Sequence, residues 1–384
     1  MNRRILSAVR VLDMTQIVAG PYCTRMLADL GADVVKIDPP SPAARRGEPR
    51  PSAGPASQNL GKRSIVLDLA HPDGLNAARE LANSADVLVQ NYRPGSLERR
   101  GLGYTALSEA NPRLIYASIS GFGPNTSSAS RGAYGATAHA EAGWLWVQQQ
   151  AQGGDLPFAP GVTVADIATG MNACTAILAA LYDRQQTGKG QEISVSLMDS
   201  QLAFLSEAAA PAISDPDESN WTPFRHGLQK ARDGYLAINL GAPKNWKRLA
   251  TAMGDPALEL PADRVTAEQL LSDWVATQTI DQAAEALRKA GAPYGILRSM
   301  HEALSDGYFE ERGMLTEIET PAGPPIKAIS SPLFFSGAGA APARPAPMAG
   351  EHTTEILREL GLKESQIESM LTSGAAEQPG HSKA

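Results

Sequence analysis

The chain has 384 residues, of which 43% are hydrophobic and 20% charged, the composition of a soluble globular protein. Its 34 basic and 41 acidic residues give a formal charge of −7, which argues against a nucleic-acid-binding protein, for which a basic stripe is expected. The length exceeds the size at which a single hydrophobic core stops growing, so two substructures are expected.

The first 200 residues alternate β-rich runs with amphipathic stretches. The β-rich runs predict strands at residues 10–14, 33–38, 64–69, 86–91, 114–120 and 192–197. Amphipathic patterns predict helices at residues 23–31 and 74–85. Apolar strands separated by helices indicate a parallel sheet covered on both faces, so an α/β fold is predicted. A Pro-, Gly- and Arg-rich loop, residues 38–57, leaves the carboxyl end of a predicted strand, where open α/β sheets bind ligands.

The second half of the chain predicts a smaller domain. The polar, Pro-containing segment 211–225 is interpreted as a linker. Strand and helix patterns over residues 226–310, including an amphipathic stretch at 266–291, predict a small α/β domain. Strand-like runs follow, then a capped helix at residues 350–362. Residues 373–384 are expected to be a disordered tail.

Cysteine usage and the apolar runs indicate a compartment. Cys23 and Cys174 lie in apolar helical contexts away from any Cys/His cluster, and are interpreted as buried thiols in a reducing compartment. No stretch reaches 18 uninterrupted apolar residues, and the N-terminus lacks a signal-peptide pattern. A cytoplasmic protein without a membrane span is therefore expected.

The common cofactor and metal motifs are absent. There is no GxGxxG, GxSxG or HExxH, and Gly190 follows Lys189 where a phosphate loop needs Ser or Thr. Neither a permanently bound cofactor nor a metal is therefore expected. Loops after predicted strands carry a group of arginines that suits a phosphorylated ligand, namely Arg93, Arg99, Arg100 and Arg131.

A single acid, Asp166, is predicted to open a closely packed helix that runs to about Thr187. An aspartate in this place is most simply a helix N-cap. The functional alternative is a nucleophile, because the helix dipole keeps a carboxylate ionised and such a carboxylate can attack an activated acyl group. His139 is more simply a satisfied core or interface histidine than a catalyst.

Long blocks of the sequence resemble the class III CoA-transferase family. They are "VRVLDMTQIVAGPYCTRMLADLGADVVKIDPP", "GKRSIVLDL", "NYRPGSLERRGLGYTALSEANPRLIYASISGFG", "TGKGQEISVSLMD" and "APMAGEHTTEILRELGL". The family includes formyl-CoA and carnitine CoA-transferases and the α-methylacyl-CoA racemases. The resemblance implies a large Rossmann-like CoA-binding domain in residues 1–210 and 311–372, with a return linker, and a ring-shaped monomer in an interlocked homodimer.

The resemblance also implies the site. The family's nucleophile falls on Asp166, which would form an aspartyl-acyl anhydride and then an aspartyl-CoA thioester while CoA moves between carboxylic acids. Acyl-CoA and a carboxylic acid are the implied substrates. The implied CoA contacts are Val18, Ala19, Leu67, Asn91, Tyr92, Arg93, Arg99 and Arg131. Candidate substrate contacts are Gln16, Tyr134 and His139. His139, Arg131 and Trp144 favour a small polar or dicarboxylic acid as substrate.

Other functions fit less well. A racemase needs two acid/base groups on opposite faces of the α-carbon, and Tyr134 occupies the position of the racemase histidine. By the resemblance, Gly135 stands where many relatives carry an acid, so a second carboxylate cannot act there. Ala70 stands where some relatives carry a lysine that contacts CoA. The absence of a GGGG loop argues against formyl-CoA and oxalate as substrates. A non-catalytic CoA-binding protein is weakly supported, because Asp166 and its flanks are intact.

Overall fold

The computed structural model describes residues 4–48, 56–152, 160–215, 217, 227–240, 243–320, 323–338 and 344–380. The chain divides into two compact units. The first unit comprises Met1–Trp146, Pro157–Ala210 and Glu310–Ala384, and the second comprises Val147–Leu156 and Pro211–Phe309. The prediction placed all of residues 1–210 in the large domain, whereas Val147–Leu156 belong to the second unit. The chain enters the second unit again at Pro211 and leaves it after Phe309, beside the predicted boundaries at residues 210 and 310. Of the predicted linker 211–225, residues 211–214 are helical, and residues 216 and 218–225 lie outside the described part.

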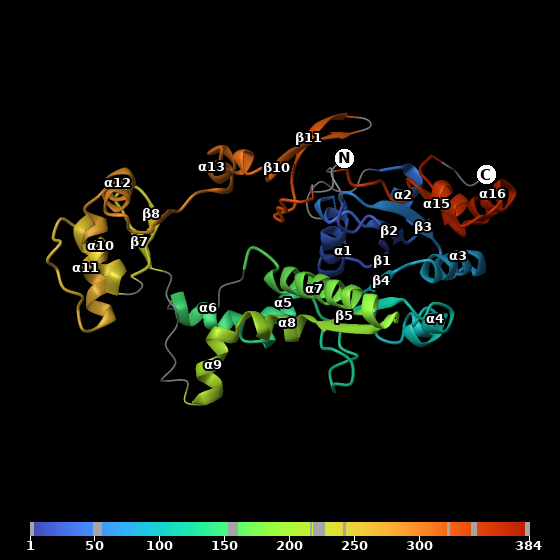
Figure 1. Ribbon diagram of the computed structural model, residues 1–384, viewed down its shortest axis with the longest axis horizontal. Coiled ribbons are helices and arrows are strands. Elements are labelled where there is room, and N and C mark those ends of the chain that lie inside the picture. The colour runs from blue at the N-terminus through green and yellow to red at the C-terminus, as the bar shows by residue number, and fades with distance from the viewer. Residues whose placement is uncertain are drawn as a thin grey trace. The chain divides into compact units, whose positions relative to one another are not determined.

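The centre of the first unit is a seven-stranded sheet of order β12-β3-β2-β1-β4-β5-β6 (Figure 1). Its strands are β1 (Arg10–Met14), β2 (Asp33–Asp38), β3 (Arg63–Leu67), β4 (Val87–Gln90), β5 (Ile115–Ser120), β6 (Glu192–Ser196) and β12 (Ala376–Glu377). All neighbours are parallel except the pair β12 and β3. The six strands predicted from the sequence are confirmed, with ends displaced by at most two residues.

The order of these strands creates a crevice. The chain runs from β1 outward through β2 to β3, then crosses back to β4, which lies on the other side of β1. The connections that leave β1 and β4 therefore diverge, and their carboxyl ends form a topological switch point, the usual ligand site of open α/β sheets.

Helices cover both faces of the sheet. Those of the first unit are α1 (Ala19–Asp29), α2 (Pro42–Arg46), α3 (Pro72–Asn83), α4 (Tyr104–Ala110), α5 (Gly135–Glu141), α7 (Val164–Thr187), α8 (Leu197–Phe204), α15 (Thr353–Glu359) and α16 (Glu364–Ser373), with short 3₁₀ turns η1 (Ser57–Asn59) and η2 (Glu98–Arg100). Helices α6 (Trp144–Gln152), α9 (Ser206–Ser214) and α14 (Tyr308–Glu311) lie where the chain passes between the units, and β10 (Leu315–Thr320) and β11 (Gly323–Ile329) form a separate hairpin.

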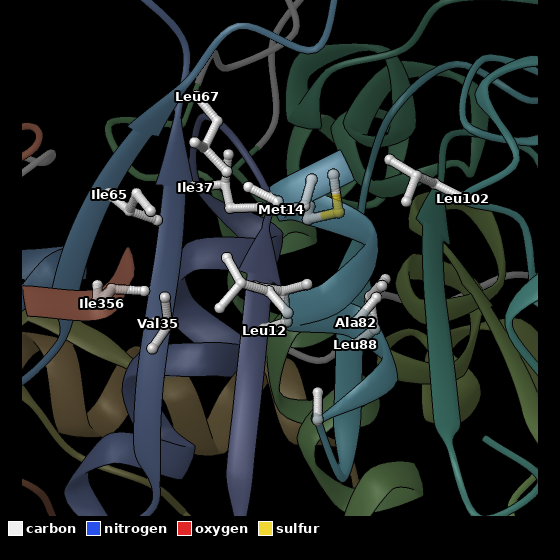
Figure 2. Close-up of a cluster of buried hydrophobic side chains, with 14 of the residues drawn as sticks. Leu12, Met14, Val35, Ile37, Ile65, Leu67, Ala82, Leu88, Leu102 and Ile356 are labelled. Carbon is white, nitrogen blue, oxygen red and sulfur yellow. The ribbon is translucent and has the colours of Figure 1, made fainter. Parts of the chain in front are cut away.

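Alternate strand residues supply two hydrophobic cores. Leu12 and Met14 of β1 face a core that also contains Ile356 of α15 (Figure 2). Val11, which precedes Leu12 in the strand, faces the opposite core with Cys23 of α1 and Cys174 of α7. Both cysteines are buried, as expected, and burial raises the pKa of each thiol. The period of two along each strand thus explains why the sheet is buried on both faces.

Helix α7 packs closely against α1, and small residues permit this contact. A Cβ atom placed on Gly170 would lie 2.6 Å from the carbonyl oxygen of Ala19. Within the described residues, α7 is also the helix whose length and apolar composition would suffice to cross a membrane. Half of that apolar window is buried within the fold, as in the core helix of a globular domain.

The second unit is a small α/β fold. Its three-stranded sheet contains β7 (Leu228–Lys230), β8 (Tyr235–Ala237) and β9 (Gly295–Ile296), and its helices are α10 (Pro243–Ala252), α11 (Arg264–Ala276), α12 (Ile280–Ala290) and α13 (Met300–Ser305). The amphipathic stretch 266–291 is two helices rather than one. Thr279 and Gln282 form a capping box that starts α12, because each side chain bonds the backbone of the other.

The tail expected to be disordered differs in the structure. Residues 376–377 form β12, which pairs with Val66 and Leu67 of β3, and both Ala375 and Ala376 are fully buried. The side chain of Arg45 bonds the Glu377 carboxylate at 2.6 Å, and Thr353 bonds its carbonyl oxygen at 2.7 Å. The polar composition of this segment gives no local signal for a strand. The contacts that order it come from residues about 25 to more than 300 positions earlier in the chain.

We predict that Ala376→Asp destabilises the protein by about 3 kcal/mol or more, because it buries an unpaired carboxylate. Thr372→Asp, four residues earlier on an exposed position, should change the free energy of unfolding by about 0.5 kcal/mol or less. Urea denaturation of both variants measures the difference. Equal effects would show that residues 374–377 are not part of the fold.

Candidate active site

A cavity of about 370 Å³ opens at the switch point of the sheet. Its walls are the loops that follow β1, β4 and β5, the segment before α5, and the first turns of α7 and α8. The lining residues are Gln16, Ile17, Val18, Ala19, Asn91, Tyr92, Arg93, Pro94, Ile119, Ser120, Gly121, Ala129, Arg131, Gly132, Ala133, Tyr134, Asp166 and Leu197. Asp166 is the only carboxylate among them.

Nine of the candidate site residues line this cavity. They are Gln16, Val18, Ala19, Asn91, Tyr92, Arg93, Arg131, Tyr134 and Asp166. Leu67 instead lies in the hydrophobic core at the end of β3, and His139 and Trp144 are buried outside the lining. Arg99 lies in η2, with its guanidinium over Gly95, next to the lining residue Pro94. The described part of loop 38–57 does not reach the cavity, and residues 49–55 lie outside the described part.

Sequence reasoning missed several lining residues, notably Ile17, Pro94 and Leu197. Each is adjacent in sequence to a predicted contact or to a strand end. Their position after β1, β4 and β6 in a parallel sheet was the available signal, since the carboxyl ends of parallel strands share one edge.

Asp166 lies in the first turn of α7 but is not its N-cap. The helix begins at Val164 with Thr163 as N-cap, so the prediction that Asp166 opens the helix is wrong by two residues. Only 7% of Asp166 is exposed. Burial raises the pKa of its carboxyl, and the backbone N–H of Gly135, which donates to it, acts in the opposite direction. The site therefore holds a desolvated carboxylate with few hydrogen bonds, which increases its reactivity as a nucleophile.

Gly135 permits this contact because it has no side chain. A Cβ atom built on Gly135 would lie 2.2 Å from Oδ2 of Asp166. Such a contact is too short for any side chain, so the glycine is required for the carboxylate to approach the backbone of α5. An acid at this position is therefore incompatible with this placement of Asp166.

His139 supports the start of α7 from behind. It is 3% exposed, and its Nε2 accepts a hydrogen bond of 3.0 Å from the backbone N–H of Ala165. The ring packs edge-on against Trp144, with ring centres 4.4 Å apart. Burial lowers the pKa of His139, so the ring is neutral and its Nε2 lone pair is occupied by the helix. Of the two interpretations, the satisfied core histidine matches this geometry.

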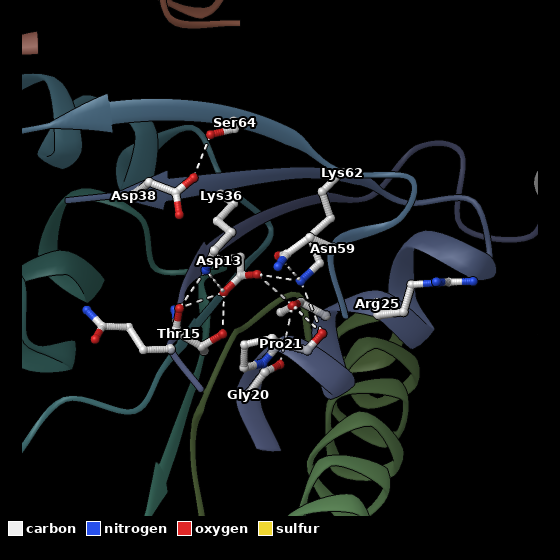
Figure 3. Close-up of polar contacts among 12 residues, drawn as sticks. Asp13, Thr15, Gly20, Pro21, Arg25, Lys36, Asp38, Asn59, Lys62 and Ser64 are labelled. Carbon is white, nitrogen blue, oxygen red and sulfur yellow. Dashed lines mark hydrogen bonds and ion pairs between the residues drawn. The ribbon is translucent and has the colours of Figure 1, made fainter. Parts of the chain in front are cut away.

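The loop between β1 and α1 is held by a buried charged group centred on Asp13 (Figure 3). Asp13 is fully buried, and its Oδ2 accepts a 2.9 Å hydrogen bond from Lys62. Lys36 lies 3.9 Å from Oδ1 and donates to the carbonyl oxygen of Thr15 at 2.6 Å. Lys62 also donates to the carbonyl oxygen of Pro21 at 3.1 Å. The two lysines therefore tie the two ends of the loop to one carboxylate.

The pKa of Asp13 reflects these contacts. Burial alone would raise it, but Lys36 and Lys62, with hydrogen bonds from Thr15 and Thr24, hold it well below its ordinary value of 3.8. Asp13 is thus ionised throughout the physiological range, and the loop is fixed by a charge rather than by apolar packing alone.

Between these fixed ends the loop is strained. Ile17 has a φ of 71°, and its side chain is 64% exposed while lining the cavity. A β-branched residue in the left-handed region is a genuine outlier that costs on the order of 1–3 kcal/mol. Such strain persists only where surrounding contacts determine the backbone, and it is typical of ligand sites.

Two arginines give the cavity wall positive charge. Arg131 pairs with Glu141 at 2.6 Å and its guanidinium lies 4.4 Å from the centre of the Phe122 ring. Arg93 is exposed and has no ion-pair partner in the part of the chain that the structure describes. Arg93 is therefore the cation most available to an anionic ligand in this cavity.

Comparisons with known proteins identify the family. Residues 6–353 match CoA-transferase family III. The succinyl-CoA:glutarate CoA-transferase of Mus musculus is 32% identical, and the alignment covers 97% of this chain and 90% of that protein. The succinyl-CoA:mesaconate CoA-transferase of Haloarcula hispanica is 33% identical, with coverage of 93% and 96%. The solved structure of Rv3272 from Mycobacterium tuberculosis is similar with a TM-score of 0.80 at 26% identity, covering 93% and 100%. The chain belongs to CoA-transferase family III.

We predict that Lys62→Met lowers the free energy of unfolding by about 3–5 kcal/mol, because it leaves the buried Asp13 without its closest cation. The folded-state pKa of Asp13 is below 3.8, so its stabilising contribution is complete above about pH 4 and falls as the pH drops further. Urea denaturation at pH 7 and at pH 3 should therefore show a smaller difference between variant and parent at the lower pH.

Arg46→Met is the control, since Arg46 pairs with Glu48 on the surface. It should leave the urea midpoint unchanged. A Lys62→Met protein as stable as Arg46→Met would contradict the central role of the buried group.

Proposed function

We propose that this protein is a CoA-transferase that moves CoA from an acyl-CoA to a second carboxylic acid, with Asp166 as the nucleophile. One observation carries the proposal: the single carboxylate in the switch-point cavity is buried, weakly hydrogen bonded and held at a helix start. Burial of this kind is unfavourable for a purely structural aspartate and favourable for one that attacks an acyl group.

The first half of the reaction loads the enzyme. An oxygen of Asp166 attacks the thioester carbonyl, the C–S bond breaks, and an aspartyl-acyl anhydride and CoA thiolate form. The thiolate then attacks the aspartyl carbonyl carbon of the anhydride. The bond between that carbon and the bridging oxygen breaks, so the donor acid leaves as its carboxylate and Asp166 carries CoA as a thioester. Each tetrahedral intermediate places a negative charge on oxygen that nearby donors must stabilise.

The second half transfers CoA to the acceptor. The acceptor carboxylate attacks the aspartyl thioester and releases CoA thiolate, which leaves a new mixed anhydride. The thiolate then attacks the acceptor's acyl carbon and restores the Asp166 carboxylate. Atoms and charge balance without an external oxidant or base, because each nucleophile is already an anion.

The cations at the cavity support an anionic substrate. Arg93 is available for a phosphate of CoA, and Arg99, over Gly95, is near the same loop. The two relatives described above are named for succinyl-CoA as donor and for dicarboxylic acceptors. We therefore propose a dicarboxylic donor and a dicarboxylic acceptor. Arg131, Tyr134 and Gln16 line the cavity and are the residues we propose to contact the acid.

The racemase alternative is not favoured. A second acid/base group would have to face the α-carbon across from Asp166. Tyr134 stands at the position of the racemase histidine, and the nearby His139 uses its Nε2 on the backbone of Ala165. The relatives compared here are named as transferases.

We further propose that the protein works as a homodimer in the cytoplasm. Support comes from an apolar groove of about 460 Å³ formed by the start of α7 and the second half of α8, with Val162, Met171 and Phe204 each about half or more exposed. Exposed apolar surface of this kind is typical of protein interfaces. Light scattering should give twice the chain mass, whereas a monomer at micromolar concentration would rule the dimer out.

The covalent intermediate provides the decisive test. Incubation with succinyl-CoA and hydroxylamine should inactivate the enzyme, and mass spectrometry should place a hydroxamate on Asp166. Asp166→Asn should lose activity by about 10⁴-fold or more, the order expected when a nucleophile is removed. Asp183→Asn, on an exposed turn of the same helix, is the matched control and should retain activity. Inactivation without an adduct on Asp166, or proton exchange at the α-carbon without an acceptor acid, would refute the proposal.

The pH profile tests the ionisation of Asp166. Attack requires the carboxylate, so kcat/KM should fall as the pH drops through the pKa of Asp166, which burial raises above 3.8. Gly135→Ala forces Oδ2 away from the Gly135 N–H, which had lowered the pKa, so the acid limb should move to higher pH. Gly161→Ala, where a Cβ meets no atom within 4 Å, is the control and should leave the limb in place.

A further inference from the structure

The strained residue Ile17 stands out from the rest of the described backbone. Only one other non-glycine residue in that part of the chain, Asn125, has a positive φ, and asparagine tolerates this conformation. Ile17 is β-branched, exposed and part of the cavity wall. The loop would relax to an ordinary conformation unless contacts next to Ile17 prevented it.

The contact that prevents relaxation comes from Asn91, the residue that follows β4. Its Oδ1 accepts a 2.8 Å hydrogen bond from the backbone N–H of Gln16, and its Nδ2 donates a 2.7 Å bond to the Gln16 carbonyl oxygen. The Asn91 side chain thus bonds both the N–H and the carbonyl oxygen of Gln16, the residue before Ile17. These bonds imitate the pairing that a further residue of β4 would make, and they continue the contact of β1 with β4 beyond the end of β1.

A neighbouring residue interacts with the side chain of the same glutamine. Burial raises the pKa of Tyr92, and the Gln16 side chain acts on its hydroxyl in the opposite direction. The backbone N–H of Tyr92 in turn donates to the Gln90 side chain at 2.8 Å, and Gln90 bonds Ser118 of β5 at 2.9 Å. Residues at and after the end of β4 therefore hold the backbone of Gln16, and they are themselves tied to β5.

We propose that Asn91 is a positioning residue for CoA transfer: it holds Gln16 and the strained Ile17 in place, so that the loop after β1 presents the thioester to Asp166. The inference rests on the proposed function. It gives the Asn91 amide a task distinct from a direct CoA contact, because the geometry commits one donor and one acceptor to Gln16.

A double-mutant cycle separates the two tasks. Asn91→Ala should lower kcat/KM by about 10- to 100-fold, mainly through kcat, because a displaced loop misaligns the reacting thioester. Ile17→Gly removes the strain, since glycine adopts positive φ freely. In that background Asn91→Ala should cost clearly less, because the loop no longer needs to be held against relaxation. An equal loss in both backgrounds is the result of a direct CoA contact and would overturn the proposal.

Asn111→Ala is the matched control. Asn111 also bonds backbone, donating to the carbonyl oxygens of Asn83 at 3.1 Å and Ala85 at 2.9 Å, but it lies outside the cavity. It should lower the unfolding midpoint while leaving kcat/KM unchanged. A comparable loss of kcat/KM in Asn111→Ala would assign the Asn91 effect to general stability and overturn the proposal.

Hydrogen exchange tests the clamp without any turnover. The Gln16 amide should exchange faster in Asn91→Ala than in the parent and stay protected in Asn111→Ala. Unchanged protection in Asn91→Ala would overturn the clamp even in an active enzyme. If the parent protein transferred no CoA, the proposed function would fail, while the exchange result would still decide whether Asn91 holds the loop.

Discussion

The arrangement of the cavity depends on one buried carboxylate. Asp13 is placed at the end of the central strand β1 and is met by ammonium groups from two other segments. Burying these charges is costly, and the cost is offset only while all partners are in place. Because Lys36 and Lys62 also donate to the carbonyl oxygens of Thr15 and Pro21, the same interaction fixes where the loop starts and where α1 begins.

Asp166 is aligned with that loop through helix packing. Gly170 lies one turn after Asp166 on the same face of α7, and it lets the helix approach the Ala19 carbonyl closely. The contact between α1 and α7 therefore sets the distance between the carboxylate and the loop. Glycines at 135 and 170 act together in this respect: one admits the backbone of α5 to Asp166, and the other admits α7 to α1. The absence of a side chain at these two positions is therefore as important for the geometry of the site as the side chains that line it.

The sequence predicted the frame of the molecule well. Apolar periodicity located six strands, since fully buried parallel strands carry a strong local signal. Resemblance placed nine cavity residues, because long blocks preserve the loops after β1 and β4. The sequence could not show that Asn91 bonds Gln16, since 75 positions separate them and neither residue has a local pattern that requires the other. Nor could it show the positive φ of Ile17, because isoleucine is among the residues least suited to it.

Two of the misplaced predictions, the helix start at Asp166 and the tail, have the same cause. Asp166 is the residue type that commonly caps a helix. Its carboxylate instead accepts a hydrogen bond from the backbone N–H of Gly135 in α5, and not from the backbone of its own helix. Residues 373–380 had the composition of a tail, yet the backbone of β3 offered hydrogen bonds that only the folded sheet brings within reach. In both places a long-range partner overrode a local preference, and such partners are not visible in short windows of sequence.

The two-residue strand β12 has a consequence for the edge of the sheet. Among the described strands, it is the one that pairs with the outer side of β3. His352 and Thr353 also bond the backbone of Ser64 and Val66, so β12 and the start of α15 together occupy this edge. Removal of both segments would leave free backbone donors and acceptors on β3, the kind of edge that pairs with strands of other molecules. The C-terminal segment therefore protects the sheet against aggregation as well as completing its fold.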